Sequence, residues 1–309
     1  MARIPRLLLQ GESATYHIIS RTALAGFVLG DVEKDHLVRL LRHLCGVYFT
    51  DPIGFCVMGN HVHLLVRMQP GEAFSDDDIR HRFRRYYGEG SKRELLDGQI
   101  PLLREKWASL SEFVKDLKQS FSRWFNKTHR RHGFFWGERF KSVLVEDGDT
   151  VINVLGYVDL NPVRAGLVER PEDYRWSSLG YHVQTGNQGD FLSLDFGLRS
   201  FANWDDAQRL RAYRKFVYGL VAPAGKGASI PEKVVEAEEQ KGFELTATDR
   251  LLYRTRYFTD SGVIGTKAFV ADCYRRFEDH FACRHPKKPQ AVDGLDGVFS
   301  LKRLRAAPT

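Results

Sequence analysis

The spacing of hydrophobic positions changes early in the chain. Residues 14–22 (ATYHIISRT) have the composition of a strand, and after Asp31 the pattern changes to apolar residues three and four positions apart. Asp31 is a suitable helix cap, and the repeating positions are Leu37, Leu40, Leu41 and Leu44. We therefore predict a strand followed by an amphipathic helix.

Two apolar runs then flank the pair Gly59-Asn60: IGFCVM at 53–58 and HVHLLVR at 61–67. Both turn residues tolerate positive φ, so the pattern predicts a tight hairpin. Successive side chains in a strand point to opposite faces, so His61 and His63 share one face of the second strand. The two imidazoles are expected to lie side by side.

The pattern weakens over residues 75–98, which are polar without a clear period and predict a mobile insertion or a short basic helix. Ser109 and Glu112 then form a capping-box pattern before a long apolar stripe, which we expect to end at Gly133. Residues 134–145 are aromatic and β-branched, which indicates a strand or a bent hairpin.

A further helix is predicted from Asp149, as cap, to about Leu160, because Pro162 disfavours helical backbone at the residue before it. Tyr157 and Asn161 stand four positions apart, so a phenol and an amide would share one side of this element. Each has an ordinary alternative: Tyr157 as a half-buried helix tyrosine, and Asn161 as the cap of a following helix.

Composition adds limits. The 309 residues suffice for one large core and a second small domain, and the net charge of +7 favours acidic partners without requiring nucleic acid. Four cysteines, no signal-like leader and no apolar run of about 18 residues favour a cytoplasmic protein over a membrane or secreted one.

The histidine pair has two possible interpretations. It is a divalent metal site, or it is one hydrogen-bonded imidazole beside one exposed imidazole. Tyr157 and Asn161 favour the metal site. An ion could be held by His61, His63 and the Asn161 amide while the tyrosine attacks a phosphodiester. Imidazole ligands suit Mn, Fe, Co or Zn better than Mg. A tyrosine phenol is protonated at neutral pH, and the sequence identifies no general base.

Three motifs extend this pattern: GNHVHLLV, WGERFKSVLV and GYVDLNPVRAGLVERPEDYRWSS. They resemble those of REP-associated tyrosine transposases, bacterial relatives of the single-tyrosine HUH transposases. RYFTDSGVIGTKAFV at 256–270 is similar to the C-terminal extension of that family, and the resemblance runs from Met1 to about Phe281. The insertion at 80–107 is longer than the resemblance leads us to expect.

The resemblance implies an α+β fold: a ferredoxin-like HUH domain whose antiparallel sheet is flanked by helices, with a mainly helical C-terminal extension. The expected parts are 1–185, 186–285 and a loosely ordered tail at 286–309. His61 and His63 would bind Mg or Mn with Asn161 as third ligand, and Tyr157 would form a 5′-phosphotyrosine with single-stranded DNA. The protein would act as a monomer or homodimer at the bacterial nucleoid.

Stretches that combine cations with aromatic residues are candidate DNA contacts, since cations bind phosphates and rings stack on unpaired bases. One is RHRFRRYY at 80–87, although a solvated charged face explains it equally well. The predicted contacts are Arg123, Lys127, Arg130, Arg131, Arg139, Lys141 and Arg164.

Three functions are compatible with these residues. The first is a metal-dependent enzyme that cuts and rejoins hairpin-forming single-stranded DNA through Tyr157. The second is a domesticated hairpin-binding protein without transposition activity, and the third is a metal-dependent hydrolase that uses water. The third function leaves Tyr157 without a role.

Overall fold

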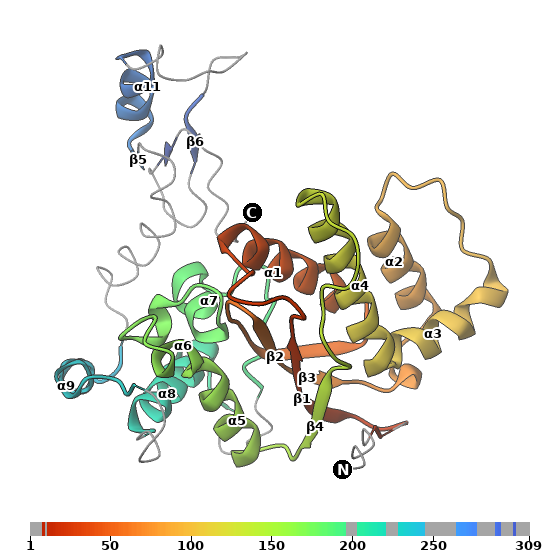
Figure 1. Cartoon of the computed structure of the whole chain (residues 1–309), viewed down its shortest axis with the longest axis horizontal. Coiled ribbons are helices and arrows are strands. Elements are labelled where there is room, and N and C mark those ends of the chain that lie inside the picture. Colours follow the sequence, from red (N-terminus) through yellow and green to blue (C-terminus); the bar gives the residue numbers. More distant parts are fainter. Residues whose placement is uncertain are drawn as a thin grey trace. The chain divides into compact units, whose positions relative to one another are not determined.

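The computed structural model describes residues 8–9, 11–195, 203–220, 228–244, 264–276, 288–291 and 299–300. Its centre is a four-stranded sheet in the order β2-β3-β1-β4 (Figure 1). Every neighbouring pair is antiparallel. The strands are β1 (Ala14–Arg21), β2 (Thr50–Val57), β3 (His61–Met68) and β4 (Lys141–Val145).

Two long helices connect the strands in the ferredoxin-like order. Helix α1 (Asp31–Cys45) joins β1 to β2, and α4 (Leu110–Thr128) lies between β3 and β4. Because β3 is inserted between β1 and β2, the first βαβ unit is split, as this fold requires. The predicted α+β fold with helices flanking an antiparallel sheet is confirmed.

The two faces of the sheet have different covers. Tyr16, Ile18, Val62 and Leu64 are buried on one face, which α1 and α4 cover side by side (Figure 1). The opposite face carries the histidines and packs against α5 (Asp149–Asp159), which contacts β2 and β3. This second cover is partial, since Val143 of β4 remains 54% exposed.

The hairpin forms where predicted, but its turn differs from the expectation. Met58 N–H donates to the His61 carbonyl at 2.9 Å across Gly59-Asn60, and neither turn residue has positive φ. Gly59 is needed for space instead, because a Cβ there would lie 2.7 Å from Cδ1 of Phe27. The glycine allows the loop after β1 to pack onto the turn.

Helix boundaries also differ in detail. Asp31 and Asp149 are the first residues of α1 and α5, and glycines occupy both N-cap positions. The two carboxylates therefore lie in the first turn, where they complement the positive end of the helix dipole. Helix α4 begins with the predicted Ser109 cap but ends at Thr128, five residues before Gly133.

The insertion contains ordered helices. After the short turn η1 (Gly71–Ala73), the elements are α2 (Asp76–Tyr87), η2 (Asp97–Gln99) and α3 (Ile100–Ala108). Arg82 donates to three carbonyls at the end of α1, those of Gly46, Val47 and Tyr48, at 3.0–3.2 Å. Part of the basic stretch therefore supports the fold.

The remaining described residues form mostly short helices. Unit one comprises Met1–Gly180 and Gly189–Glu244; unit two comprises Tyr181–Gln188 and Leu245–Thr309. The remaining elements are α6 (Asn161–Arg164), η3 (Pro171–Asp173), α7 (Ser178–Thr185), α8 (Asp206–Gly219), α9 (Glu232–Gln240), β5 (Ile264–Gly265), α11 (Lys267–Arg276), β6 (Gln290–Ala291) and β7 (Phe299–Ser300).

Strands β5, β7 and β6 form a small sheet in the second unit, so described parts of the tail contribute to it. Residues 256–263 of the C-terminal motif lie outside the described residues. The boundaries at 185 and 285 stay predictions. Within the described ranges, no helix combines the length and apolar character needed to span a membrane.

Contact between α1 and α4 makes stability depend on pH. The His36 ring stacks on Trp124 with centroids 3.8 Å apart, and burial, aided by Arg39, lowers the pKa of His36 to about 4. The unfolded chain therefore binds a proton between about pH 6.5 and pH 4 that the folded chain does not. Stability from this group is lost as pH falls through that window.

We expect His36→Phe to keep the ring contact and to reduce this acid sensitivity. Urea unfolding at several pH values between 4 and 7.5 measures the effect. The free energy of unfolding should fall less steeply towards low pH in the variant than in the natural chain. Equal slopes for the two proteins would contradict the assignment.

Candidate active site

Strand pairing brings a third histidine to the predicted pair. In the β1–β3 register, Arg21 lies opposite His61 and Ile19 opposite His63. His17 lies two residues before Ile19 in β1, so its side chain shares the same face. Its Nε2 lies 3.0 Å from Nδ1 of His63, and the two rings stack with centroids 5.2 Å apart.

The surroundings lower the pKa of all three imidazoles and so favour their neutral form. Burial lowers the pKa of His63 to about 3, with further lowering by His17 and His61. Burial also lowers the pKa of His17 to about 4. The pKa of His61 is lowered by burial and by the Arg21 guanidinium. Neutral imidazoles keep the lone pairs that metal binding requires.

Hydrogen bonds orient the two predicted ligands. Nδ1 of His61 donates to Oδ1 of Asn60 at 2.7 Å, which leaves the lone pair of His61 on Nε2. When Nδ1 of His63 donates to Nε2 of His17, the lone pair of His63 is likewise left on its Nε2. Partners of this kind select the tautomer and fix the ring plane of metal-binding histidines.

Tyr157 lies next to this cluster. Its ring centroid is 5.9 Å from that of His63 and 6.2 Å from that of His17, in edge-on geometry. The side chain is 45% exposed, so a large substrate can reach it. The Arg164 guanidinium lies over the same ring at 5.0 Å. The phenol, the imidazoles and one cation therefore occupy one site.

A buried carboxylate holds the tyrosine helix in place. Asp159 is fully buried and accepts hydrogen bonds from Ser178 Oγ at 2.7 Å, Leu179 N–H at 3.0 Å and Tyr213 Oη at 2.6 Å. Burial raises the pKa of Asp159 to about 6, although these bonds oppose the shift. Side chains two positions apart point to nearly opposite sides of a helix. The bonds of Asp159 therefore leave Tyr157 facing the histidines.

Asn161 begins α6, one turn beyond Tyr157. Its Nδ2 donates to the carbonyls of Tyr157 at 2.9 Å and Val158 at 3.2 Å, which leaves Oδ1 as the atom available to a ligand. Among the residues that the structure describes, no three His, Cys, Asp or Glu side chains gather around a metal-sized point. A third protein ligand would therefore come from another residue type, which fits an asparagine amide.

The predicted DNA-binding cations separate into two groups. Arg164 and Lys141 belong to the site, since Lys141 pairs with Ile19 on the histidine face, and Arg139 is exposed just before it. The others lie on α4, which covers the opposite face, or just after its end. They are Arg123, Lys127 and Arg130, all exposed, and Arg131, which packs near Phe125.

His17 is the site residue that sequence reasoning missed. It is the one histidine of β1, buried between Tyr16 and Ile18. That position was a usable signal, because the predicted fold places β1 beside β3. The register, which the local pattern does not contain, was needed to place His17 near His63.

Removing the His17 ring should destabilise the site. His17→Leu leaves Nδ1 of the buried His63 without its partner, at a cost of about 1–3 kcal/mol in the free energy of unfolding. His17→Gln retains an acceptor and should cost less. Urea unfolding of both variants at pH 7.5 without metal measures the difference, and equal losses would show that the hydrogen bond contributes nothing.

Comparison with known proteins gives one curated relative. It is a Haemophilus influenzae protein named "Putative REP-associated tyrosine transposase", 25% identical over 166 residues. The aligned region covers 51% of this chain and 78% of the relative. No family model matches the chain.

Two solved structures are also similar at low identity. A REP-associated tyrosine transposase bound to a REP hairpin has a TM-score of 0.42 at 14% identity, covering 62% of this chain and 92% of that one. A putative transposase from Deinococcus radiodurans R1 has a TM-score of 0.27 at 19% identity, covering 52% and 96%. The curated relative confirms the resemblance of this chain to REP-associated tyrosine transposases.

Proposed function

We propose that this chain is a metal-dependent enzyme that cuts and rejoins hairpin-forming single-stranded DNA through Tyr157. The observation that carries the proposal is the position of the Tyr157 ring, 5.9 Å from His63 and 6.2 Å from His17 by ring centroids. A nucleophile beside neutral metal-binding imidazoles suits phosphoryl transfer better than either feature alone.

The proposed step is a transesterification. The Tyr157 oxygen attacks a backbone phosphorus, the bond to the 3′ oxygen breaks, and a 5′-phosphotyrosine forms. The phenol proton is lost and the departing 3′ oxygen gains a proton. Attack by a 3′ hydroxyl on the phosphotyrosine reverses the reaction, so the same site can join strands without an external energy source.

Residues of this chain would also hold the metal that the resemblance implies. Nε2 of His61 and His63 and the Asn161 amide oxygen would bind a divalent ion such as Mn or Mg. When bound, the ion would neutralise charge that develops on the phosphate oxygens. Arg164 would stabilise negative charge near Tyr157.

The proposed substrate is a REP-like repeat, a hairpin with unpaired flanks, and the proposed place of action is the nucleoid of a bacterial cytoplasm. The exposed cations Arg139 and Lys141 and the partly exposed Arg164 would bind its phosphates. The relative from H. influenzae supports this choice through its name, which refers to such repeats.

The tyrosine is the most direct test. Tyr157→Phe should abolish a covalent protein–DNA adduct, because the nucleophilic oxygen is removed, and should leave hairpin binding within about twofold. Denaturing gels with labelled repeat hairpins and Mn detect the adduct, and fluorescence anisotropy measures binding. Tyr87→Phe, on α2, is a matched control that should retain the adduct.

The outcomes separate the candidate functions. An adduct that persists in Tyr157→Phe would exclude this nucleophile. Cleavage without any adduct in the natural chain would favour a hydrolase that uses water. Hairpin binding with neither cleavage nor adduct would favour a domesticated binding protein.

The histidines provide a second test. His63→Ala should weaken Mn binding at least tenfold by titration calorimetry, and cleavage should no longer respond to added Mn or Mg. His61→Ala should behave in the same way. His36→Phe, outside the site, should keep the response of the natural chain. Unchanged Mn affinity in both alanine variants would reject the metal assignment.

A further inference from the structure

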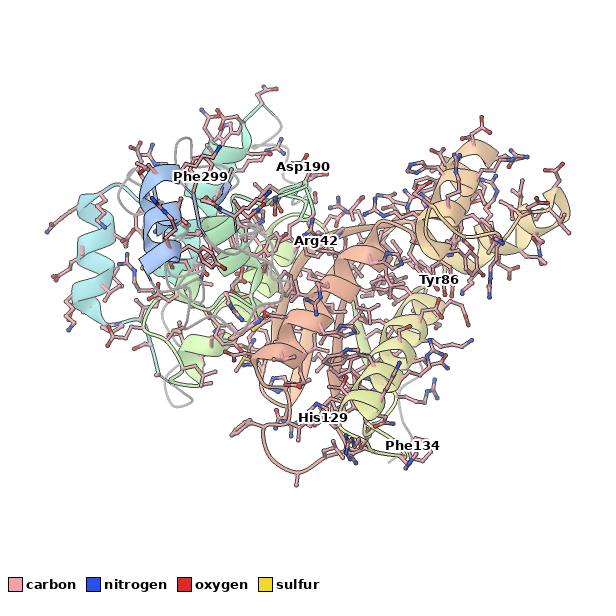
Figure 2. The ribbon with its side chains drawn as sticks, turned by 90° about the horizontal axis from the view of Figure 1, so that it is seen from above. Arg42, Tyr86, His129, Phe134, Asp190 and Phe299 are labelled. Atoms are coloured by element: carbon pink, nitrogen blue, oxygen red, sulfur yellow. The ribbon has the colours of Figure 1, made fainter. Side chains whose placement is uncertain are left out.

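Two phenylalanine rings near the candidate site are almost fully exposed. Phe27 is 83% exposed and Phe134 is 90% exposed. A buried residue lies close to each in sequence, Leu29 at 2% and Phe135 at 1%. Figure 2 shows Phe134 at the end of α4, pointing away from the helices. Two large exposed rings on neighbouring loops indicate a binding surface.

The loop of Phe27 is attached to the histidine hairpin. Thr22 N–H donates to the Asn60 carbonyl and Leu29 N–H to the Gly59 carbonyl, both at 2.9 Å. Phe27 itself packs over Gly59, where a Cβ would lie 2.7 Å from its Cδ1. One edge of the ring is thereby held two residues from His61, and most of the ring faces solvent.

The loop of Phe134 is attached to the same end of the sheet. Ala23 N–H donates to the Phe135 carbonyl at 2.7 Å, and Gly137 N–H donates to the Arg21 carbonyl at 3.0 Å. On its other side, Nδ2 of Asn126 donates to the Gly133 carbonyl at 2.9 Å. Both rings therefore project from loops that are hydrogen-bonded to the edge of the sheet where β1 ends and β3 begins.

Cations accompany the rings. Arg21 is exposed, lies opposite His61 in the strand register and lowers the pKa of that histidine. Arg139 is exposed two residues after Gly137. In the described part of the chain, neither guanidinium forms an ion pair. Both are available for phosphate groups.

We propose that Phe27 and Phe134 form a stacking site for unpaired bases of single-stranded DNA, with Arg21 and Arg139 binding its phosphates. The proposal rests on the proposed function and deepens it, since it assigns the residues that hold the single-stranded flank near His61 and Tyr157. Aromatic faces combined with cations are the usual elements of sequence-tolerant single-strand binding.

The chemistry favours this occupant over others. A blunt duplex hides the faces of its bases, so it would use the arginines and leave both rings exposed. A second copy of the chain or another protein would use the rings but would leave two unpaired guanidinium groups to desolvate at considerable cost. Single-stranded DNA satisfies both features together.

The test measures binding of fluorescein-labelled oligothymidine by anisotropy, in a Tyr157→Phe background that prevents cleavage. Phe27→Ala and Phe134→Ala should each weaken binding roughly 5- to 100-fold, because base stacking on the ring is lost. Binding of a blunt duplex should change less than twofold. Phe134→Trp should restore affinity, and its tryptophan fluorescence should be quenched by the oligonucleotide.

Leu102→Ala is the matched control, because Leu102 is 66% exposed on α3, away from these loops. It should bind oligothymidine like the parent protein. Thermal unfolding verifies that each alanine variant is folded. Unchanged affinity in both folded phenylalanine variants would overturn the stacking site. Loss of self-association with unchanged DNA affinity would likewise overturn it and would assign the surface to a contact between copies.

The result of this binding test can be distinguished from the result of the adduct test of the proposed function. If alanine variants lose single-strand binding while the natural chain forms no adduct, the stacking site stands and the strand-transfer chemistry fails. If the natural chain forms the adduct and the alanine variants bind and react equally well, the chemistry stands and the stacking site fails.

Discussion

The antiparallel register between β1 and β3 is the constraint on which the site depends. It places His61 opposite Arg21 and His63 opposite Ile19, and so brings His17 within 3.0 Å of His63. A slip of one residue would turn every one of these side chains to the other face. Burial of Tyr16, Ile18, Val62 and Leu64 on that other face opposes such a slip. The apolar core therefore determines the geometry of the polar site.

The histidine cluster also explains how polar groups are tolerated in the middle of a packed sheet. His17 and His63 are 7% and 3% exposed, and each satisfies a nitrogen of the other. Their lowered pKa values show that the surroundings exclude charge, which makes the rings neutral donors. An isolated buried imidazole would lack both a partner and a fixed tautomer.

Sequence patterns predicted the hairpin with its histidine pair and the helix that carries Tyr157, because each depends on local periodicity. The fold class was implied by the resemblance of the motifs to those of a known family. They did not predict His17, whose role requires the pairing of strands far apart in sequence. Gly59 was assigned to turn backbone, whereas packing of Phe27 explains it. Arg82 resembled a DNA contact but caps the carbonyls after α1, since a charge pattern does not reveal its partners.

The buried carboxylate of Asp159 has a consequence for how many chains build one active centre. An alternative arrangement would have two copies of the chain exchange α5. Here such an exchange would break three hydrogen bonds to a fully buried acid and separate α5 from Ser178 and Tyr213 of its own chain. The anchor thus favours a site in which Tyr157 and the imidazoles come from a single polypeptide.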